Sequence, residues 1–206
     1  MAGRACLRHR GGVFFMIGGL PLFPLRTVLL PGASLGLRIF ETRYLDMVRD
    51  CGRSGTGFGI SLLLADDDDD GKPPAPAAVG TEARIEDFGT ADDGLLTLRV
   101  RGARRFRVLK PHVRTNGLMV VDADWLEPDP DDELRPEHSL LGTILQQVID
   151  QAGGEFSKAP ASRFDDAAWV GWRLAELLPL SDQQRQLLLQ ENDPHARLDR
   201  LLLLMP

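Results

Sequence analysis

The chain has 206 residues, of which 43% are hydrophobic and 26% are charged. This ordinary globular composition excludes a chain that is disordered throughout. The formal net charge of -6 and the pI of about 5.2 disfavour a general nucleic-acid binder, because phosphate binding depends on basic surfaces. The two cysteines and four histidines do not follow the spacing of a zinc site. No metal and no cofactor is therefore predicted, and a disulfide between Cys6 and Cys51 is disfavoured, since the rest of the chain is typical of a cytoplasmic protein.

Residues 1–15 are expected to be an extension without a fold of its own. Arginines precede an apolar stretch over residues 13–23, in an order that loosely mimics a secretory signal peptide. Glycines and prolines interrupt this stretch, and it is shorter than the roughly 20 apolar residues of a membrane span. We therefore interpret Met16 as the natural start and predict no membrane segment.

Strands are predicted to open the folded part. Pro21, Pro24 and Pro31 punctuate the apolar residues 20–30. Proline lacks a backbone donor, so this region suits edge strands and strand ends. Residues 35–40 alternate between two faces and predict a second strand.

A helix is predicted next, over residues 42–51. Leu45 and Val48 fall on one of its faces, with Tyr44 and Met47 beside them, and Gly52 is placed to end it. Alternating glycines then indicate a tight turn before a buried strand over residues 57–64.

Five consecutive aspartates, Asp66–Asp70, and a proline-rich segment predict a long solvated loop. A calcium site is disfavoured there, because the ligand pattern of an EF-hand is absent. An Asp-Gly turn at residues 91–94 then separates further alternating segments. The strands predicted in this region are 79–88, 95–100, 104–109 and 118–126.

The last part of the chain is predicted to be helical. Residues 127–133, rich in Glu, Pro and Asp, are the best candidate for a domain boundary. Beyond them apolar residues recur with helical spacing, and short connections predict a small antiparallel bundle. Trp169 and Trp172 are expected to be structural anchors. Helix N-caps are predicted at Asp165, at Ser181 with Gln184, and at Asp193 before Pro194.

The sequence contains no recognisable catalytic motif. A P-loop, a GxSxG elbow, an HExxH pair and a dinucleotide-binding GxGxxG are all absent. Adjacent Ser157 and Lys158 do not suit a peptidase dyad. Acidic residues on the helix over residues 42–51 alternate with arginines and favour surface ion pairs. We therefore predict no catalytic residues and no enzyme activity.

Several runs of sequence resemble one known family. Residues 21–32 (PLFPLRTVLLPG) and 37–44 (LRIFETRY) are similar to the opening of the substrate-binding N-terminal domain of Lon protease. Residues 79–85 (VGTEARI) and 102–107 (GARRFR) resemble its later strands, and 171–180 (GWRLAELLPL) resembles the helical segment of stand-alone bacterial members. The aspartate- and proline-rich insertion departs from the pattern.

The resemblance implies an α+β fold, in which a PUA-like β pseudobarrel over residues 16–127, related to a domain of cereblon, precedes a helical bundle over residues 134–206. It implies a non-catalytic module without the ATPase and peptidase regions of Lon. The expected partner is unfolded or tagged polypeptide, and the expected setting is a protease or adaptor complex in the cytoplasm.

The polar members of the family signature, Arg38, Glu41, Arg43 and Tyr44, are the candidate peptide-binding surface. Alternatively, they lock the strand to the helix. A proline-broken edge near residues 21–31 is expected to accept an added strand.

RNA binding is the alternative function, since PUA-like folds often bind RNA. The acidic balance of the chain disfavours it, although five arginines could cluster on adjacent strands. These are Arg99, Arg101, Arg104, Arg105 and Arg107.

Overall fold

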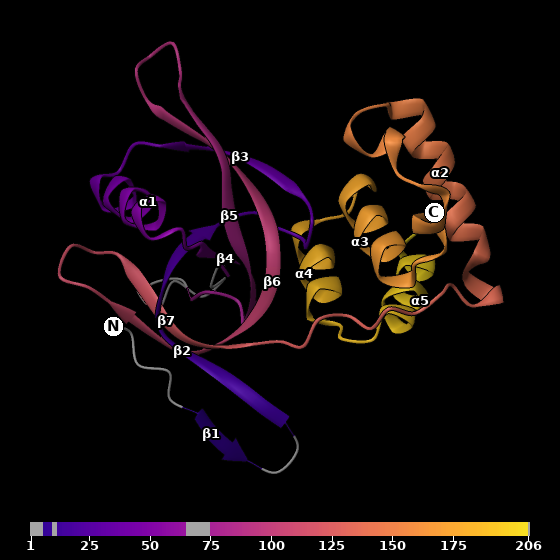
Figure 1. The fold of residues 1–206 in the computed structure, drawn as a ribbon, viewed down its shortest axis with the longest axis horizontal. Helices are drawn as coiled ribbons and strands as arrows, with labels where there is room; N and C mark the ends of the chain where they lie inside the picture. Colours follow the sequence, from indigo (N-terminus) through magenta and orange to yellow (C-terminus); the bar gives the residue numbers. More distant parts are fainter. Residues whose placement is uncertain (1–5, 10–11, 65–74, 206) are drawn as a thin grey trace. The chain divides into compact units, whose positions relative to one another are not determined.

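A computed structural model describes residues 6–9, 12–64 and 75–205, and the chain divides into two units after Glu127 (Figure 1). The run Asp66–Asp70, expected to be a loop, lies outside the described residues. The first unit contains the strands and one helix, and the second contains the remaining helices. The first-unit elements are β1 (Cys6–His9), β2 (Gly12–Leu25), β3 (Ser34–Ile39), α1 (Thr42–Ser54), β4 (Phe58–Leu62), β5 (Val79–Thr90), β6 (Leu96–Val113) and β7 (Met119–Trp125).

Five strands of the first unit close into a ring. The pairing runs from β2 through β4, β5, β6 and β7 and returns to β2. β3 pairs with residues 96–101 of β6, on the edge where β7 pairs with residues 106–113. The pairing of β2 with β4 is parallel, and the other pairings are antiparallel. The closed ring with one helix confirms the predicted PUA-like β pseudobarrel.

The prolines of β2 predict an edge strand, and each half of β2 is paired along one edge only by the strands that the structure describes. Residues 16–21 of β2 pair with β7, and residues 22–25 pair with β4. The strand therefore exchanges one partner for the other at Pro21. Each half has a partner on one side, so the donor-less proline nitrogens can face the other side.

Strand β6 is one long strand where the sequence predicts two. Gly102 and Ala103 suggest a break, but the strand continues through both. A Cβ at Gly102 would collide with the carbonyl oxygen of Leu30. The amide of Gly102 donates to the Ala33 carbonyl at 2.9 Å, and the Gly32 amide donates to the Gly102 carbonyl at 2.8 Å. The glycine therefore serves a close backbone approach inside a strand.

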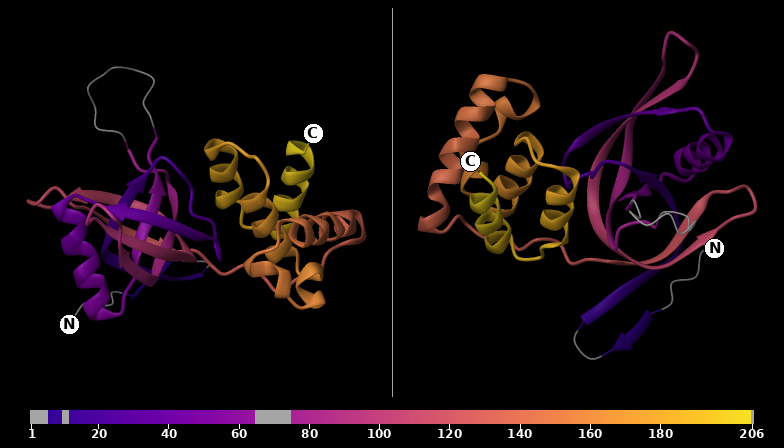
Figure 2. Two further views of the ribbon diagram at one scale, coloured as in Figure 1. Left: turned by 90° about the horizontal axis from the view of Figure 1, so that it is seen from above. Right: turned by 180° about the vertical axis from the view of Figure 1, so that it is seen from behind.

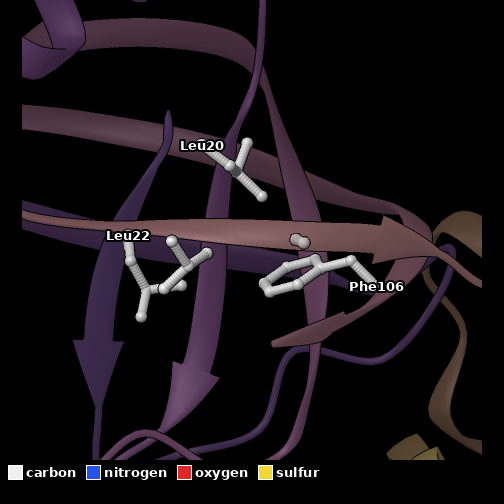
Figure 3. Close-up of a cluster of buried hydrophobic side chains, with 5 residues drawn as sticks. Leu20, Leu22 and Phe106 are labelled. Atoms are coloured by element: carbon white, nitrogen blue, oxygen red, sulfur yellow. The ribbon is translucent and has the colours of Figure 1, made fainter. Parts of the chain in front are cut away.

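Phe106 is a central side chain of the pseudobarrel core (Figure 3). It is fully buried and packs with Leu20 and Leu22. A Cβ at Gly59 would lie 2.7 Å from its ring, and one at Gly80 would lie 2.5 Å from it. The sequence predicts a tight turn from the alternating glycines near β4. The turn requires Gly55, whose φ is 64°. Gly59 is required instead by the packing of the core.

Helix α1 is longer than predicted, and its buried face is centred on Tyr44 and Met47 and not on Leu45 and Val48. It continues past Gly52 to Ser54, and Gly55 ends it in the left-handed conformation. Tyr44, Met47 and Cys51 are buried, whereas Leu45 is 38% exposed. The buried face of the helix consists of Tyr44, Met47 and Cys51, which are spaced i, i+3 and i+7. Leu45 is apolar but lies outside this spacing.

Residues 6–9 and 12–15, expected to have no fold of their own, form strand β1 and the start of β2. These two segments pair antiparallel. Val13, Phe14 and Phe15 favour a strand through their β-branched and aromatic side chains.

The second unit is the predicted helical bundle (Figure 2). Helix α3 packs against α2, α4 and α5, and its residues 170–175 are all buried. The capping box of Ser181 with Gln184 and the cap at Asp193 are confirmed. The cap of α3 is Asp166 and not Asp165, because the 3-10 helix before it extends through Asp165. The second-unit elements are η1 (Pro136–His138), α2 (Ser139–Ala152), η2 (Glu155–Lys158), η3 (Ala161–Asp165), α3 (Ala167–Leu177), α4 (Asp182–Gln190) and α5 (Pro194–Leu204).

The acidic segment after Glu127 is built into the helical unit. Asp129 accepts a hydrogen bond from Trp172 Nε1 at 2.6 Å and two from the Arg197 guanidinium at 2.9 and 3.2 Å. Arg197 is fully buried and lies 3.5 Å above the Trp172 ring. Trp172 is 5% exposed and is thus a buried anchor. The residues between the two predicted domains therefore supply the counter-charge of a buried cation.

Replacing Asp129 with Ala is expected to destabilise the helical unit by about 3–5 kcal/mol, because the buried Arg197 charge would lose its carboxylate. Urea unfolding followed by helical circular dichroism measures the loss. Asp131→Ala, at an exposed position of the same segment, is the control and should change stability by less than about 0.5 kcal/mol. Equal stability of the two variants would contradict the anchoring role of Asp129.

Candidate functional site

An open groove of about 300 Å³ lies beside the outer strand β3. One wall is formed by residues 23–25 of β2, and the other by residues 36–41, which include the end of β3. Tyr44 of α1 closes its base together with Phe23: the two rings lie 4.2 Å apart at 55°. The groove therefore has an aromatic base and backbone on both sides.

The outer edge of β3 is free along this groove. β3 pairs with β6 through all six residues from Ser34 to Ile39. No other strand in the part of the chain that the structure describes pairs with it. A Cβ at Gly36 would meet nothing within 4 Å. An incoming chain would thus find backbone donors and acceptors with little side-chain obstruction.

Phe40 supplies exposed apolar surface at the end of the groove. Its side chain is 71% exposed, although it directly follows buried Ile39. An aromatic ring offers about 150–250 Å² of surface that association can remove from water. Phe40 is therefore the apolar group of this site that is most available to a partner.

Charged side chains stand at the rim. Arg38 is exposed and forms an ion pair with Asp93 of the β5–β6 turn. Glu41 precedes α1 at its N-cap position and pairs with Arg43 at 2.6 Å. Because both groove-lining charges have opposite charges beside them, the rim has no strong net charge.

Arg43 lies outside the groove lining and performs a different task. Its Nη1 donates to the carbonyl oxygen of Gly117 at 2.8 Å, and its guanidinium lies 4.8 Å from the Tyr44 ring centre. Gly117 belongs to the turn between β6 and β7. Arg43 thus ties α1 to that turn, whereas Arg38, Glu41 and Tyr44 come together at the groove.

Burial raises the pKa of the Tyr44 phenol above its ordinary value, and the nearby Arg43 charge opposes this effect. The neutral phenol is therefore the form that the folded state favours. Its contribution to stability is complete below the ordinary pKa of about 10 and is lost as the pH rises through the higher folded value.

We expect the Tyr44 phenol to ionise at higher pH in the folded protein than in urea. Tyr44 is the sole tyrosine, so ultraviolet absorbance of phenolate reports on this position alone. Phe23→Ala should bring the folded titration toward the unfolded one, because it removes the ring that covers Tyr44. Identical curves in folded and unfolded parent protein would show that the phenol is solvated.

The groove contains residues that the sequence does not single out. Phe23 and Phe40 both belong to the family signature, and from the sequence we interpret the apolar residues of that signature as determinants of the fold. The signal that could identify Phe40 is its place in the alternating strand, on the same face as Arg38 and opposite the face of Leu37 and Ile39. Phe23 gives no such signal, because its role depends on Tyr44, which is distant in sequence.

The arginines of β6 do not form a free basic surface. Arg99 pairs with Asp87 at 3.5 Å, Arg104 pairs with Glu82 at 3.2 Å, and Arg101 pairs with Glu86. All three acids lie on β5, the neighbouring strand. Arg105 is buried. The cluster that the RNA alternative requires is therefore largely neutralised.

The described part of the chain can also be considered for a metal site, a reactive thiol and a membrane-spanning helix. No group of three or more His, Cys, Asp or Glu side chains there could hold a metal ion. Cys51 is a free, buried thiol, and burial raises its pKa, which favours the unreactive neutral form. None of the helices described combines the length and the apolar character that crossing a membrane requires.

A pseudobarrel with an open groove, followed by a helical bundle, defines a PUA-like binding domain with a helical extension. The chain belongs to the ATP-dependent protease La (LON) substrate-binding domain family, whose model matches residues 19–206.

Two solved structures place the chain within this class. It is 58% identical to the Lon N-terminal domain protein from Xanthomonas campestris, with a TM-score of 0.79 over 92% of this chain and 100% of that one. The N-terminal domain of Mycobacterium avium complex Lon protease shares the fold, with a TM-score of 0.65, 19% identity, and coverage of 89% of this chain and 96% of that one.

Proposed function

We propose that this chain is a non-catalytic module that binds an extended segment of unfolded or tagged polypeptide in the groove beside β3. We further propose that it works in the cytoplasm and presents that segment to a protease or an adaptor complex. Membership of the LON substrate-binding domain family supports the polypeptide as the ligand class.

The free edge of β3 is the observation that carries the proposal. An extended peptide can add to such an edge, and its backbone then gains hydrogen bonds that do not depend on its sequence. A module that receives many unfolded chains needs this kind of recognition. The edge that the sequence predicts, near residues 21–31, lies on the other side of the same groove, where residues 22–25 of β2 pair with β4 along one edge.

The shape of the groove favours single side chains. Its volume of about 300 Å³ stands at the lower limit of small-molecule sites, and aromatic rings form its base. Phe40 would cover an apolar side chain placed there. Arg38 and Glu41 would orient the peptide and influence its association rate, since rim charges act mainly on specificity and on-rate.

Phe40→Ser is expected to weaken binding of an unfolded polypeptide by about tenfold or more, the scale of losing a central aromatic contact. Fluorescence anisotropy with labelled, reduced and carboxymethylated lactalbumin measures the affinity. Because Phe40 is exposed, the variant should unfold at the same urea concentration as the parent.

Phe88→Ser is the matched control, since Phe88 is 74% exposed and does not line the groove. It should bind as the parent does. Equal loss in both variants would indicate nonspecific adhesion to exposed aromatic rings. Unchanged binding in Phe40→Ser, with the fold intact, would place the polypeptide elsewhere.

The proposal that the chain is non-catalytic can be tested separately, by assays of ATP hydrolysis and proteolysis. With no P-loop and no peptidase motif in the sequence, we expect the purified chain neither to hydrolyse ATP nor to degrade casein in the presence of ATP. Release of phosphate and gel analysis of casein follow the two activities. Either activity, if it persisted through repeated purification, would contradict a purely binding role.

A further inference from the structure

Two buried histidines face each other inside the helical unit. His138, at the end of η1, is 1% exposed, and His195, in the first turn of α5, is 4% exposed. Their rings stack with centroids 5.5 Å apart and planes 16° apart, and their Nδ1 atoms lie within 3.4 Å. The contact joins residues 57 positions apart in sequence.

The outer nitrogen of each ring faces a carboxylate. His138 Nε2 lies 2.7 Å from Asp199 Oδ1, and His195 Nε2 lies 3.9 Å from Asp132 Oδ2. Asp193 is bound to the backbone amide of His195 at 2.8 Å. The four groups thus form a row, from Asp199 through the two rings to Asp132.

This row determines where the protons lie. An ionised carboxylate only accepts hydrogen bonds, so His138 Nε2 must carry a proton toward Asp199. In a neutral ring His138 Nδ1 is then an acceptor, and His195 Nδ1 must be the donor between the rings. His195 Nε2 is consequently the nitrogen without a proton, and it faces Asp132.

The first and second added protons have opposite effects. A proton on His195 Nε2 converts the contact with Asp132 into an ion pair and leaves the bond between the rings intact. A further proton would have to enter at His138 Nδ1. It would place two N–H donors head to head and two cationic rings in contact, away from water.

The remaining charges around the pair are already engaged or distant. Helix α2 carries one charged residue, Asp150, near its far end. On α3, Arg173 pairs with Glu176 at 2.6 Å. On α5, Arg197 pairs with Asp129, and Arg200 pairs with Glu191. The other charged groups near the pair are Asp193, whose carboxylate interacts with the His195 charge, Arg135, whose charge acts on Asp193, and Glu137 of η1.

We propose that His138 and His195 form a one-proton latch, which fastens η1 to α5 and opens when acid forces a second proton onto the pair. Histidine changes charge between about pH 5 and pH 8, so the latch operates in a physiological range. As the pH falls, the unfolded chain binds two protons here while the folded unit holds one. Stability of the helical unit therefore declines toward acid pH.

Nitrogen NMR of the full chain tests the latch directly. We expect the Nδ1 resonances of His138 and His195 to show scalar coupling across the shared hydrogen bond, and the pair to take up one proton before the helical signals change. His112, which lies on β6 outside the helical unit and is hydrogen-bonded to Asp122, serves as the control ring. Rings of His138 and His195 that show no coupling and take up their protons independently of each other would overturn the proposal.

Unfolding experiments provide the second test. Below about pH 6.5, the ordinary pKa of histidine, the folding equilibrium constant of the helical unit should fall by up to about tenfold per pH unit, the limit for one proton. In His195→Gln this dependence should be weaker, because the glutamine oxygen can accept from a doubly protonated His138. His112→Gln should behave as the parent. Equal acid dependence in all three proteins would overturn the latch, and the NMR result on the parent decides if His195→Gln does not fold.

Discussion

The contact of the Phe106 ring with Gly59 and Gly80 is the constraint on which the β unit depends. These glycines lie on the paired strands β4 and β5, and a methyl group at either would approach the ring within 2.7 Å. The ring therefore fills the interior only because two strands present bare backbone to it. With the interior filled in this way, β2 can cross from β7 to β4 and close the ring. The groove lies beside the half of β2 that has left β7.

The helical unit depends on the buried charge of Arg197, whereas the β unit depends on the buried ring of Phe106. Arg197 is fully buried, and desolvation lowers the pKa of its guanidinium, while Asp129 restores part of the preference for the charged form. Neither partner is stable there without the other. Because Asp129 lies just after the division between the units, the chain that enters the bundle also completes its core. A boundary drawn at residue 134 would remove this carboxylate.

The sequence predicts the elements of the structure better than their edges and contacts. Period-two alternation and the capping signals identify the strand at 34–39 and the box of Ser181 with Gln184, because these depend on local spacing. The continuity of β6 through Gly102 and the partners of β2 depend on distant residues, Leu30 and the strands β4 and β7. Among the candidate site residues, local sequence brings Arg38 and Glu41 to one place. It does not indicate that Arg43 turns toward Gly117.

A free edge strand risks pairing with a second copy of the same chain, and β3 carries features that oppose this outcome. It is six residues long, and the exposed Arg38 lies within it. Short length and charge are two of the means by which proteins protect sheet edges. In the proposed function, Phe40, beyond the last paired residue, would contact an apolar side chain of the bound segment without lengthening the edge. A short edge with a charged side chain is consistent with that proposal, because a receptor for unfolded polypeptide must keep its edge from pairing with its own copies.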